Sequence, residues 1–418
     1  MTQTRIVIIG AGAAGLIAAA EAAQRAANVV LLEKNTKTGV KILMSGGTRC
    51  NMTHDTDAKG ILPGYGHASR FLRHSVGAFS PQDVVHMFNR LGVATKVEST
   101  GKVFPQSDRA IQVRDALQAQ AVEAGVKIQR TQPVIGLSRD DHGWQVKTEH
   151  EIFEADRVIV AAGGRSWPGC GTTGDAYRWL ETLGHTIVET RPALVPLTGG
   201  YGWMNELSGV TLEDCVITAT NRTSDGQVTT KHKMIRRSSC LFTHFGFSGP
   251  AAMDVSRIVT LDEHRKDLRV TLDLVPDRSA EEIELRLLNT AAKNGRRRVS
   301  AVLSDWLPNR LASSIAMEMC NDTTIAELSK SARQKILVGL KSLGLPIHGT
   351  RGFNKAEVTA GGVSLDEVDP RTMESRIAQG LFIAGEVLDV DGWIGGYNFQ
   401  AAFSTGRAAG IAAARAED

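Results

Sequence analysis

The chain has 418 residues, of which 42% are hydrophobic and 22% are charged, and its formal net charge at pH 7 is +3. This length is enough for a large buried core and for two or three domains, so a small domain is excluded. A net charge this close to zero does not by itself identify a binding partner.

The cysteines favour a reducing compartment. The chain contains no CxxC pair and no spacing typical of metal ligands, and an odd number of cysteines argues against a complete disulfide framework. No segment is typical of a membrane span or a signal peptide, because the apolar run near the N-terminus carries a glycine motif. We therefore expect a cytoplasmic protein with no bound metal and no membrane partner.

Residues 5–34 predict a strand, a glycine turn, a helix and a second strand that ends at the acidic Glu33. Gly10 permits a tight turn, Gly12 lets the backbone approach a pyrophosphate, and Gly15 lets the helix pack against the strand. The helix N-terminus offers free N–H groups and a positive dipole end to phosphate. Glu33 follows where an acid accepts hydrogen bonds from ribose. The pattern indicates a dinucleotide site and leaves FAD and NAD as alternatives.

A second glycine-rich segment at residues 39–51 follows the second strand. It is expected to be a loop rich in hydrogen-bond donors, suited to a phosphate or a polar ring edge. An ordinary solvated loop is the alternative. Its polar residues and adjacent glycines are Lys41, Ser45, Gly46, Gly47, Thr48, Arg49 and Asn51.

The next elements alternate between helices and strands. A buried strand at residues 157–162 leads into Gly163 and Gly164, an ending that brings backbone close to a nucleotide at the edge of a parallel sheet. A turn-rich segment then opens a helix at residues 176–183, which Thr173 or Asp175 could cap. Earlier helices are expected at residues 81–92 and 107–125, and earlier strands at residues 126–130 and 144–148.

The pattern changes at residue 191. Residues 192–275 contain short alternating strands, such as 215–220 and 268–274, and a turn at 224–226, whereas helical patterns dominate residues 279–343. Strand character returns at residues 355–359, and the chain closes with a strand, a glycine loop and a helix at 399–414. The N-terminus of that last helix is a second candidate anion site.

Taken together, three motifs resemble the two-part FAD-binding domain of glutathione-reductase-like and fumarate-reductase-like flavoproteins. They are GAGAAG with Glu33, VIVAAGG, and GLFIAGEVLDVDGWIGGYNFQAAFSTGRAAG. Four further segments, GVKILMSGGTRCNMTH, GGRSWPGCGTTGDAY, LFTHFGFSGPA and KAEVTAGGV, are similar to the BaiN/RdsA family of bacterial FAD/NAD(P)-dependent oxidoreductases. The resemblance covers nearly the whole chain.

This resemblance implies an α/β fold whose Rossmann-like FAD-binding domain is formed by residues 1–190 and 346–418. Residues 191–278 would form an inserted β-rich, barrel-like domain and residues 279–345 a helical insert, both covering the flavin. No second GxGxxG followed by a helix is visible, so a dedicated NAD(P)H domain is not expected. NAD(P)H would reduce the flavin from the substrate cleft, or another protein would deliver the electrons.

The resemblance also implies which residues hold FAD. The N-terminal unit would bind the ADP half, and the second glycine segment and the C-terminal glycines would hold the pyrophosphate, ribityl chain and isoalloxazine. Glu386 stands where many flavoproteins of this class carry aspartate, so its geometry is expected to differ. The expected set is Gly10, Gly12, Ala13, Ala14, Gly15, Glu33, Lys34, Lys41, Ser45, Gly46, Gly47, Arg49, Cys50, Asn51, Val134, Ala162, Gly163, Gly164, Gly362, Gly385, Glu386, Gly395, Gly396, Tyr397 and Asn398.

The expected chemistry is reduction of a carbon–carbon double bond conjugated to a carbonyl, with the flavin as hydride donor. The protein must add a proton donor near neutral pKa and hydrogen-bond donors for the developing enolate. Cys50 and Cys170 are candidates because each lies in a glycine loop expected at the flavin, and His244 because it lies in LFTHFGFSGPA. Structural roles in packing are the alternatives.

The family includes members associated with reducing a uridine of large-subunit ribosomal RNA and others associated with steroid-type enones. Residues 191–345 carry 21 Lys and Arg against 17 Asp and Glu, with basic groups at 231–237 and 296–298. Such groups could follow a phosphate backbone, although they are more often a solvated face. We expect an rRNA uridine as substrate. The alternatives are a small hydrophobic enone, or a non-catalytic flavin-bearing protein that binds the ribosome, and the oligomeric state stays open.

Overall fold

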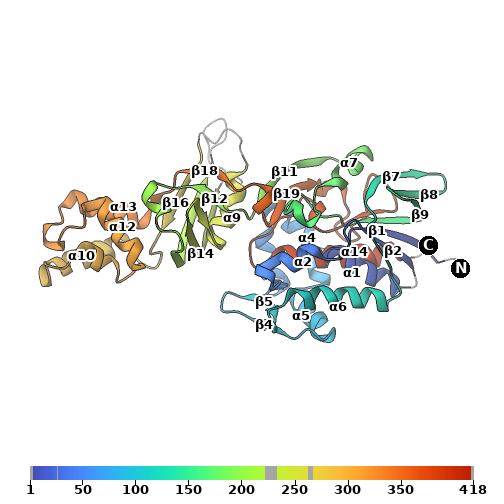
Figure 1. Ribbon diagram of the computed structural model, residues 1–418, viewed down its shortest axis with the longest axis horizontal. Coiled ribbons are helices and arrows are strands. Elements are labelled where there is room, and N and C mark those ends of the chain that lie inside the picture. Colours follow the sequence, from blue (N-terminus) through green and yellow to red (C-terminus); the bar gives the residue numbers. More distant parts are fainter. Residues whose placement is uncertain (1–2, 26, 222–232, 262–266, 416–418) are drawn as a thin grey trace. The chain divides into compact units, whose positions relative to one another are not determined.

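The structure of the protein is a computed structural model that describes residues 3–25, 27–221, 233–261 and 267–415. The chain forms two compact units, each with its own core (Figure 1). The first unit contains Met1–Pro192 and Ala356–Asp418, and the second contains Ala193–Lys355. The first unit is therefore built from both ends of the chain.

A five-stranded parallel sheet forms the centre of the first unit. Its central strand β1 is flanked by β10 and β2, so that Ile8 aligns with Ile159 and Leu31. Near-continuous apolar sequence in these strands is typical of a parallel sheet buried on both faces. In sheet order the strands are β20 (Leu381–Ile383), β10 (Arg157–Val160), β1 (Arg5–Ile9), β2 (Asn28–Glu33) and β6 (Lys127–Arg130).

Two helices from opposite ends of the sequence pack closely in the first unit. They are α1 (Ala13–Ala23) and α14 (Tyr397–Ala413), which lie side by side (Figure 1). A Cβ atom added at Gly406 would lie 2.3 Å from the Ala14 carbonyl oxygen, and one at Gly410 would lie 2.3 Å from the Ala18 carbonyl oxygen. The two glycines therefore let α14 approach the backbone of α1.

Smaller elements surround this centre. The helices are α2 (Val40–Met44), α3 (Ala58–Ile61), α4 (Ser69–Ala78), α5 (Pro81–Arg90), α6 (Ala110–Glu123) and α7 (Asp175–Thr182). One antiparallel sheet contains β3 (Thr53–His54), β5 (Lys102–Pro105) and β4 (Thr95–Val97), and another contains β7 (Val134–Asp140), β8 (Gly143–Thr148) and β9 (Ile152–Ala155). Strands β11 (Ile187–Ala193) and β19 (Val358–Val363) form a pair. Short 3-10 turns include η1 (Ser45–Thr48), η2 (Leu62–Ala68), η3 (Pro168–Cys170) and η8 (Gly385–Val387).

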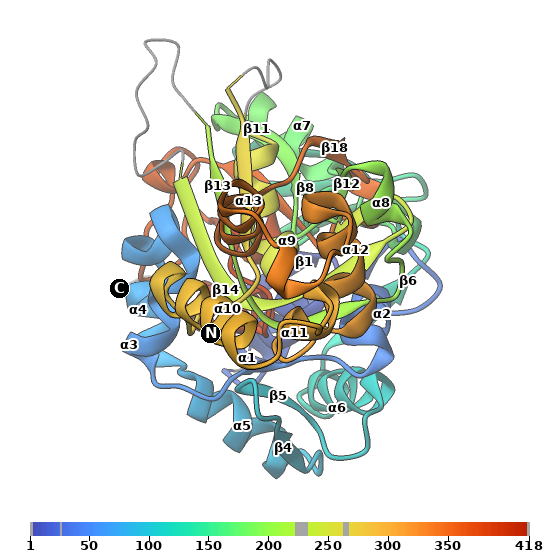
Figure 2. The same ribbon diagram turned by 90° about the vertical axis from the view of Figure 1, so that its left-hand side faces the viewer.

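The second unit is an antiparallel sheet with helices. In sheet order its strands are β17 (Leu343–Gly344), β16 (Arg269–Asp273), β13 (Thr211–Thr220), β14 (Lys233–Thr243), β15 (Gly246–Ser248), β12 (Leu197–Gly199) and β18 (Ile347–Thr350). Its helices are α8 (Gly202–Asn205), α9 (Pro250–Val259), α10 (Ala280–Lys293), α11 (Val299–Leu303), α12 (Asn309–Cys320) and α13 (Lys330–Lys341). Helices α10 to α13 gather together (Figure 2).

The boundaries differ from those expected from the sequence. The sequence predicts that residues 346–355 belong to the FAD-binding domain. In the structure they belong to the second unit, because they contain β18, which pairs with β12. The β-rich and helical inserts, expected as separate domains, share one core in which Leu287 and Leu340 join Ile217 and Leu272. Within the described residues the edge strands β17 and β18 do not pair with each other, so the sheet is open instead of barrel-like.

Several local expectations also need correction. The segment at residues 39–51 is not a loop throughout, because α2 and η1 occupy most of it. Helix α7 begins after Gly174 with no side-chain cap, since Asp175 binds Lys34 instead. The turn predicted at 224–226 lies outside the described residues. Among the described residues, no helix combines the length and apolar character needed to cross a membrane.

Candidate cofactor and catalytic site

In the first glycine motif, packing requires glycine at Gly10 and Gly15 but not at Gly12. A Cβ atom at Gly10 would lie 2.6 Å from the Ala161 carbonyl oxygen, and one at Gly15 would lie 1.9 Å from the Gly10 carbonyl oxygen. At Gly12 a Cβ atom would meet no protein atom within 4 Å. The space in front of the α1 N-terminus therefore fits a ligand group, as a pyrophosphate held by free N–H groups requires.

Glu33, the last residue of β2, stabilises this turn through a hydrogen bond. Its Oε2 accepts a hydrogen bond from the Ala11 amide at 3.0 Å, and its Oε1 accepts from the amide and side chain of Asn35, each at 2.9 Å. Burial raises the pKa of this carboxyl, although these hydrogen bonds oppose the shift. Each carboxylate oxygen can accept more than one bond, so a ribose hydroxyl can still be accommodated.

Lys34 fastens the segment at residues 166–175 to the end of β2. Its Nζ donates to Thr173 Oγ1 at 2.7 Å and to Asp175 Oδ2 at 2.6 Å, and Asn35 Nδ2 donates to the Cys170 carbonyl oxygen at 3.1 Å. Cys170 is buried, and burial raises the pKa of its thiol, which the charge of Lys41 lowers. Cys170 thus lies beside the end of β2, where the ribose of FAD is expected. The proton donor is needed at the flavin ring instead, so this position does not favour a catalytic role for Cys170.

Lys41 joins four segments of the first unit. Its Nζ donates to Ser166 Oγ at 2.6 Å and forms an ion pair with Glu386 Oε2. The other oxygen of Glu386 accepts from Ser166 Oγ at 2.6 Å and from the Thr359 amide at 3.0 Å. Helix α2, the loop after β10, strand β19 and η8 are therefore held together by one polar network. Both oxygens of Glu386 have protein partners before any cofactor hydroxyl is considered.

The cation of Arg49 is already engaged within the protein. Its guanidinium pairs with Glu98 at 2.6 Å and lies 4.1 Å from the centre of the Phe104 ring. Cys50 follows it with φ of +62° and no exposed surface, and burial raises the pKa of its thiol to about 12. A thiol that is fully enclosed and holds its proton so firmly is poorly suited to donate one. The structure therefore argues against the catalytic role expected for Cys50.

Asn51 and the C-terminal glycines come together. Oriented with its oxygen toward Gly396, the Asn51 carboxamide accepts from the Gly396 amide at 3.0 Å and donates to the Thr53 carbonyl oxygen at 2.9 Å. Gly396 has φ of +95°, and a Cβ atom there would lie 2.4 Å from the Thr53 carbonyl oxygen. Two motifs that are far apart in the sequence thus meet at the N-terminus of α14.

Tyr397 and Asn398 have structural contacts of their own. The Tyr397 ring packs 5.8 Å from both Tyr65 and Trp393, measured between ring centroids, and 5.3 Å from His54. The Asn398 side chain closes the glycine loop by bonding both the amide and the carbonyl of Gly392, at 2.8 and 3.1 Å. These residues shape the loop expected at the flavin, whatever further contacts a cofactor makes.

The other expected FAD residues lie on the same unit. Gly385 connects the C-terminal motif to the first one, because a Cβ atom there would lie 2.9 Å from the Ala14 side chain. Gly362 is required by packing, since a Cβ atom there would lie 2.6 Å from the Val387 carbonyl oxygen. Val134 is buried at the start of β7. Ala13 lies in the first turn of α1, Ser45, Gly46 and Gly47 lie in η1, and Ala162, Gly163 and Gly164 follow β10.

Two titratable residues at this site were not expected from the sequence. Glu357 lies just before β19, is half-buried, and has no hydrogen bond or ion pair among the described residues. Burial raises its pKa, while the charges of Lys41 and Lys102 lower it. His54 Nδ1 lies 3.2 Å from the Gly395 carbonyl oxygen. The available signal for Glu357 was an acidic residue at the start of an apolar strand that runs into two glycines.

His244 belongs to the second unit. It is exposed between β14 and β15, with its ring 5.0 Å from that of Phe245. Its described contact lies within the second unit, and its catalytic role stays a prediction.

Several arginines of the two expected basic patches have partners within the second unit. Arg236 pairs with the buried Asp254 at 2.7 Å, and Arg297 pairs with Asp305 at 2.6 Å. Arg237 is held between Asp214 and Asp277, and Arg298 donates to the Asp322 carbonyl oxygen. Lys231 and His232 lie outside the described residues. Arg236, Arg237 and Arg297 are therefore ion-paired, whereas Arg296 is exposed, and RNA binding by these patches stays a prediction.

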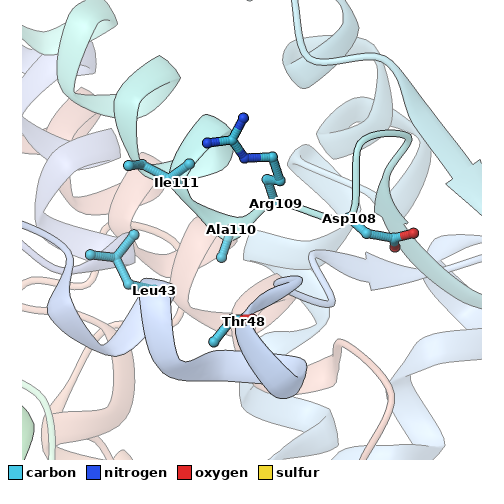
Figure 3. A pocket seen from close by; sticks show the side chains of 6 residues that line it. All are labelled: Leu43, Thr48, Asp108, Arg109, Ala110 and Ile111. Atoms are coloured by element: carbon cyan, nitrogen blue, oxygen red, sulfur yellow. The ribbon is translucent and has the colours of Figure 1, made fainter.

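An open pocket of about 240 Å3 lies beside α2 and η1 (Figure 3). Its lining residues are Leu43, Thr48, Asp108, Arg109, Ala110 and Ile111. Figure 3 shows the side chains of Asp108 and Arg109 pointing in different directions, so they do not converge on one point. None of the lining residues belongs to the set expected to hold FAD.

The chain is similar to characterised proteins over its full length. A ribosomal RNA dihydrouridine synthase of Escherichia coli K12 is 32% identical over 409 residues, which cover 97% of this chain and 96% of that protein. The enzyme of the same name from Haemophilus influenzae is 30% identical and covers 98% of each chain. A 3-dehydro-bile acid delta(4,6)-reductase of Clostridium scindens is 32% identical over 418 residues, 99% of each chain.

The fold is also similar to a solved structure, that of the 3-ketosteroid-delta4-(5alpha)-dehydrogenase of Rhodococcus jostii RHA1. The TM-score is 0.51 at 17% identity, over 99% of this chain and 97% of that one. The family model of the HI0933-like protein Rossmann domain matches residues 4–412. The expected α/β fold with a Rossmann-like FAD-binding domain is confirmed, and the chain belongs to the HI0933-like family of FAD-dependent oxidoreductases.

Proposed function

We propose that the protein reduces the C5=C6 bond of a uridine in ribosomal RNA to dihydrouridine, in the cytoplasm, with NAD(P)H as the source of electrons. The observation that supports this most is similarity over nearly the whole chain to two proteins named as ribosomal RNA dihydrouridine synthases. The first unit also offers a cradle that fits FAD, with open space at Gly12 and a brace at Glu33.

FAD supplies hydride chemistry when bound. The chain's own residues then have three tasks. The α1 N-terminus would bind the pyrophosphate and Glu33 would bind the ribose. The Lys41–Glu386 network fixes the relative positions of the four segments around the cofactor. The third task is proton donation.

Reduction of a double bond conjugated to a carbonyl requires a proton at the carbon next to that carbonyl. We assign this proton to the Glu357 carboxyl because of its position: it directly precedes β19, whose Thr359 amide donates to Glu386 in the Lys41 network. Burial also raises its pKa, which favours the protonated acid. After transfer, the nearby charges of Lys41 and Lys102 favour the carboxylate. Solvent protons restore the acid in the next cycle.

Nucleoside analysis of ribosomal RNA tests the proposed substrate. A strain that lacks the gene should lose one dihydrouridine from its large-subunit rRNA, as measured by mass spectrometry, and a plasmid copy of the gene should restore it. An unchanged dihydrouridine content would rule out rRNA as the substrate.

A small hydrophobic enone is the second candidate substrate, favoured by the similarity to the bile acid reductase. Rapid turnover of a 3-keto-4-ene steroid with NAD(P)H, together with unchanged rRNA, would support this alternative. A non-catalytic flavin-bearing protein is the third possibility. In that case neither NADH nor NADPH would bleach the FAD spectrum under anaerobic conditions.

A further inference from the structure

We propose that the exposed face of α4, together with Lys59 of α3, is the surface on which the phosphate backbone of the substrate RNA lies. We call this the α4 surface, and it consists of Lys59, Arg70, Arg73 and His74. The inference rests on the proposed function, because that function makes RNA the partner. It adds the location of the contact, which neither the fold nor the similarity to relatives specifies.

The α4 surface is basic without compensating acids. Residues 58–82 contain no Asp or Glu, although they include Lys59, Arg70 and Arg73. Helix α4 buries Phe71, Leu72, Ser75 and Val76 against the first unit. The large side chains that it exposes, Arg70, Arg73 and His74, are all basic. The helix is therefore amphipathic with a cationic outer face.

The side chains of this surface have no partner within the described part of the protein. Among the residues that the structure describes, the side chains of Lys59, Arg70, Arg73 and His74 form no hydrogen bond or ion pair. Three arginines of the second unit differ in this respect, since Arg236, Arg237 and Arg297 are each paired with an aspartate. Guanidinium groups left free in this way can bind phosphate oxygens through two parallel hydrogen bonds.

Acids flank this stretch of the sequence and have partners of their own. Asp389 lies 3.1 Å from His67 in the preceding segment, and Asp83 accepts a hydrogen bond from the Ser80 amide at the start of α5. Asp57 accepts from the Gly60 amide at the start of α3. Residues 58–82 themselves carry the positive charges of Lys59, Arg70 and Arg73 and no negative side chain, which favours a polyanion on this surface.

The α4 surface adjoins the C-terminal glycine loop. Helix α4 packs on α14, and the segment before it supports the loop through the Tyr65 hydroxyl, which donates to the Tyr397 carbonyl oxygen at 2.8 Å. The Trp393 amide donates to the Gly64 carbonyl oxygen at 3.2 Å. Figure 2 shows α3 and α4 next to each other on the first unit. RNA bound along α4 would thus pass the loop expected at the flavin.

Salt-dependent binding tests the α4 surface. The holoenzyme carrying R70Q/R73Q is compared with wild type and with K293Q/R296Q, which removes the same charge from exposed positions in the second unit. The probe is a fluorescently labelled fragment of large-subunit rRNA, and fluorescence anisotropy gives Kd over a range of salt concentrations. Loss of two phosphate contacts should lower the slope of log Kd against log salt by about 1.4 to 1.8. The visible FAD spectrum checks that each variant is folded.

The possible results distinguish a wrong assignment of the α4 surface from a wrong proposed function. The expected result is a lower slope and weaker binding for R70Q/R73Q, with K293Q/R296Q unchanged. An unchanged slope in R70Q/R73Q, or a loss confined to K293Q/R296Q, would overturn the α4 surface while rRNA could remain the substrate. If R70Q/R73Q weakened binding only to anionic phosphatidylglycerol vesicles, the surface would bind membranes instead. A wild-type protein that binds no RNA would overturn both proposals.

Discussion

Gly12 and Gly15 lie three residues apart, yet their missing side chains have different reasons. A Cβ atom at Gly12 would meet no protein atom, whereas one at Gly15 would lie 1.9 Å from the Gly10 carbonyl oxygen. We expect Gly12→Ala to cost less than about 1 kcal/mol of stability but to weaken FAD binding at least about tenfold, or ~1.4 kcal/mol. Gly15→Ala should destabilise the apoprotein by about 3 kcal/mol or more. Thermal unfolding and FAD titration measure both; equal losses of stability would contradict this explanation.

The half-buried Glu357 carboxyl makes stability depend on pH. Its pKa is raised above the ordinary value of 4.5, because burial disfavours the carboxylate. The folded state then binds the proton more tightly than the unfolded state, so stability falls as pH rises from about 4.5 through the folded pKa. Glu357→Gln removes this loss. We expect the Tm of the apoprotein variant to exceed that of wild type at pH 8 and to approach it at pH 4. A constant difference would exclude the titration of Glu357 as the cause.

The same residue has an expected effect on turnover. If the Glu357 carboxyl donates the proton, Glu357→Gln should slow reduction of the substrate by about 10²-fold or more, the usual range for a lost general acid. Glu357→Asp keeps the acid and should recover part of the rate with a shifted pH profile. Reduction of FAD by NAD(P)H needs no such proton and serves as the control. A slowed flavin reduction would indicate a structural role instead.

At the scale of elements, the contact between α1 and α14 joins the two ends of the chain. Gly410→Ala gains about 1 kcal/mol of helix propensity, but its Cβ would lie 2.3 Å from the Ala18 carbonyl oxygen. Overpacking of this kind costs about 1–3 kcal/mol or more, so the net effect should be destabilising. Ala408→Gly, at a partly exposed position of the same helix, should lose only the propensity. Urea unfolding of both variants tests this; a Gly410→Ala protein more stable than wild type would show that the helices can move apart.

The sequence predicted elements that rest on local signals. The β1–α1–β2 unit and the start of α14 were found because glycine and apolar patterns lie within a few residues of one another. Contacts between residues far apart in the sequence cannot be recognised from such local patterns. The ion pair of Lys41 with Glu386 and the pairing of Arg237 with Asp214 and Asp277 depend on the folded chain. Arg236, Arg237 and Arg297 therefore look unpaired in the sequence but are ion-paired in the structure.

At the scale of the whole molecule, the second unit is inserted between two neighbouring strands of the first. The Ser364 amide donates to the Thr186 carbonyl oxygen at 3.0 Å, and a Cβ atom at Gly361 would lie 2.1 Å from the Glu189 carbonyl oxygen. These contacts accompany the pairing of β11 with β19. The chain thus leaves the first unit and returns to it at one place.

This connection allows the second unit to be removed. Among the described residues, the core of the first unit contains none from 193–355, so we expect a chain in which a short Gly-Ser turn replaces these residues to retain that core. We expect it to unfold cooperatively and to bind FAD with the visible spectrum of a flavoprotein, while its activity on rRNA is lost. Residues 193–355 alone have their own core and should fold without binding FAD. If the shortened chain folded but stayed colourless after reconstitution, the second unit would be part of the FAD site, and the cofactor could not be assigned to the first unit alone.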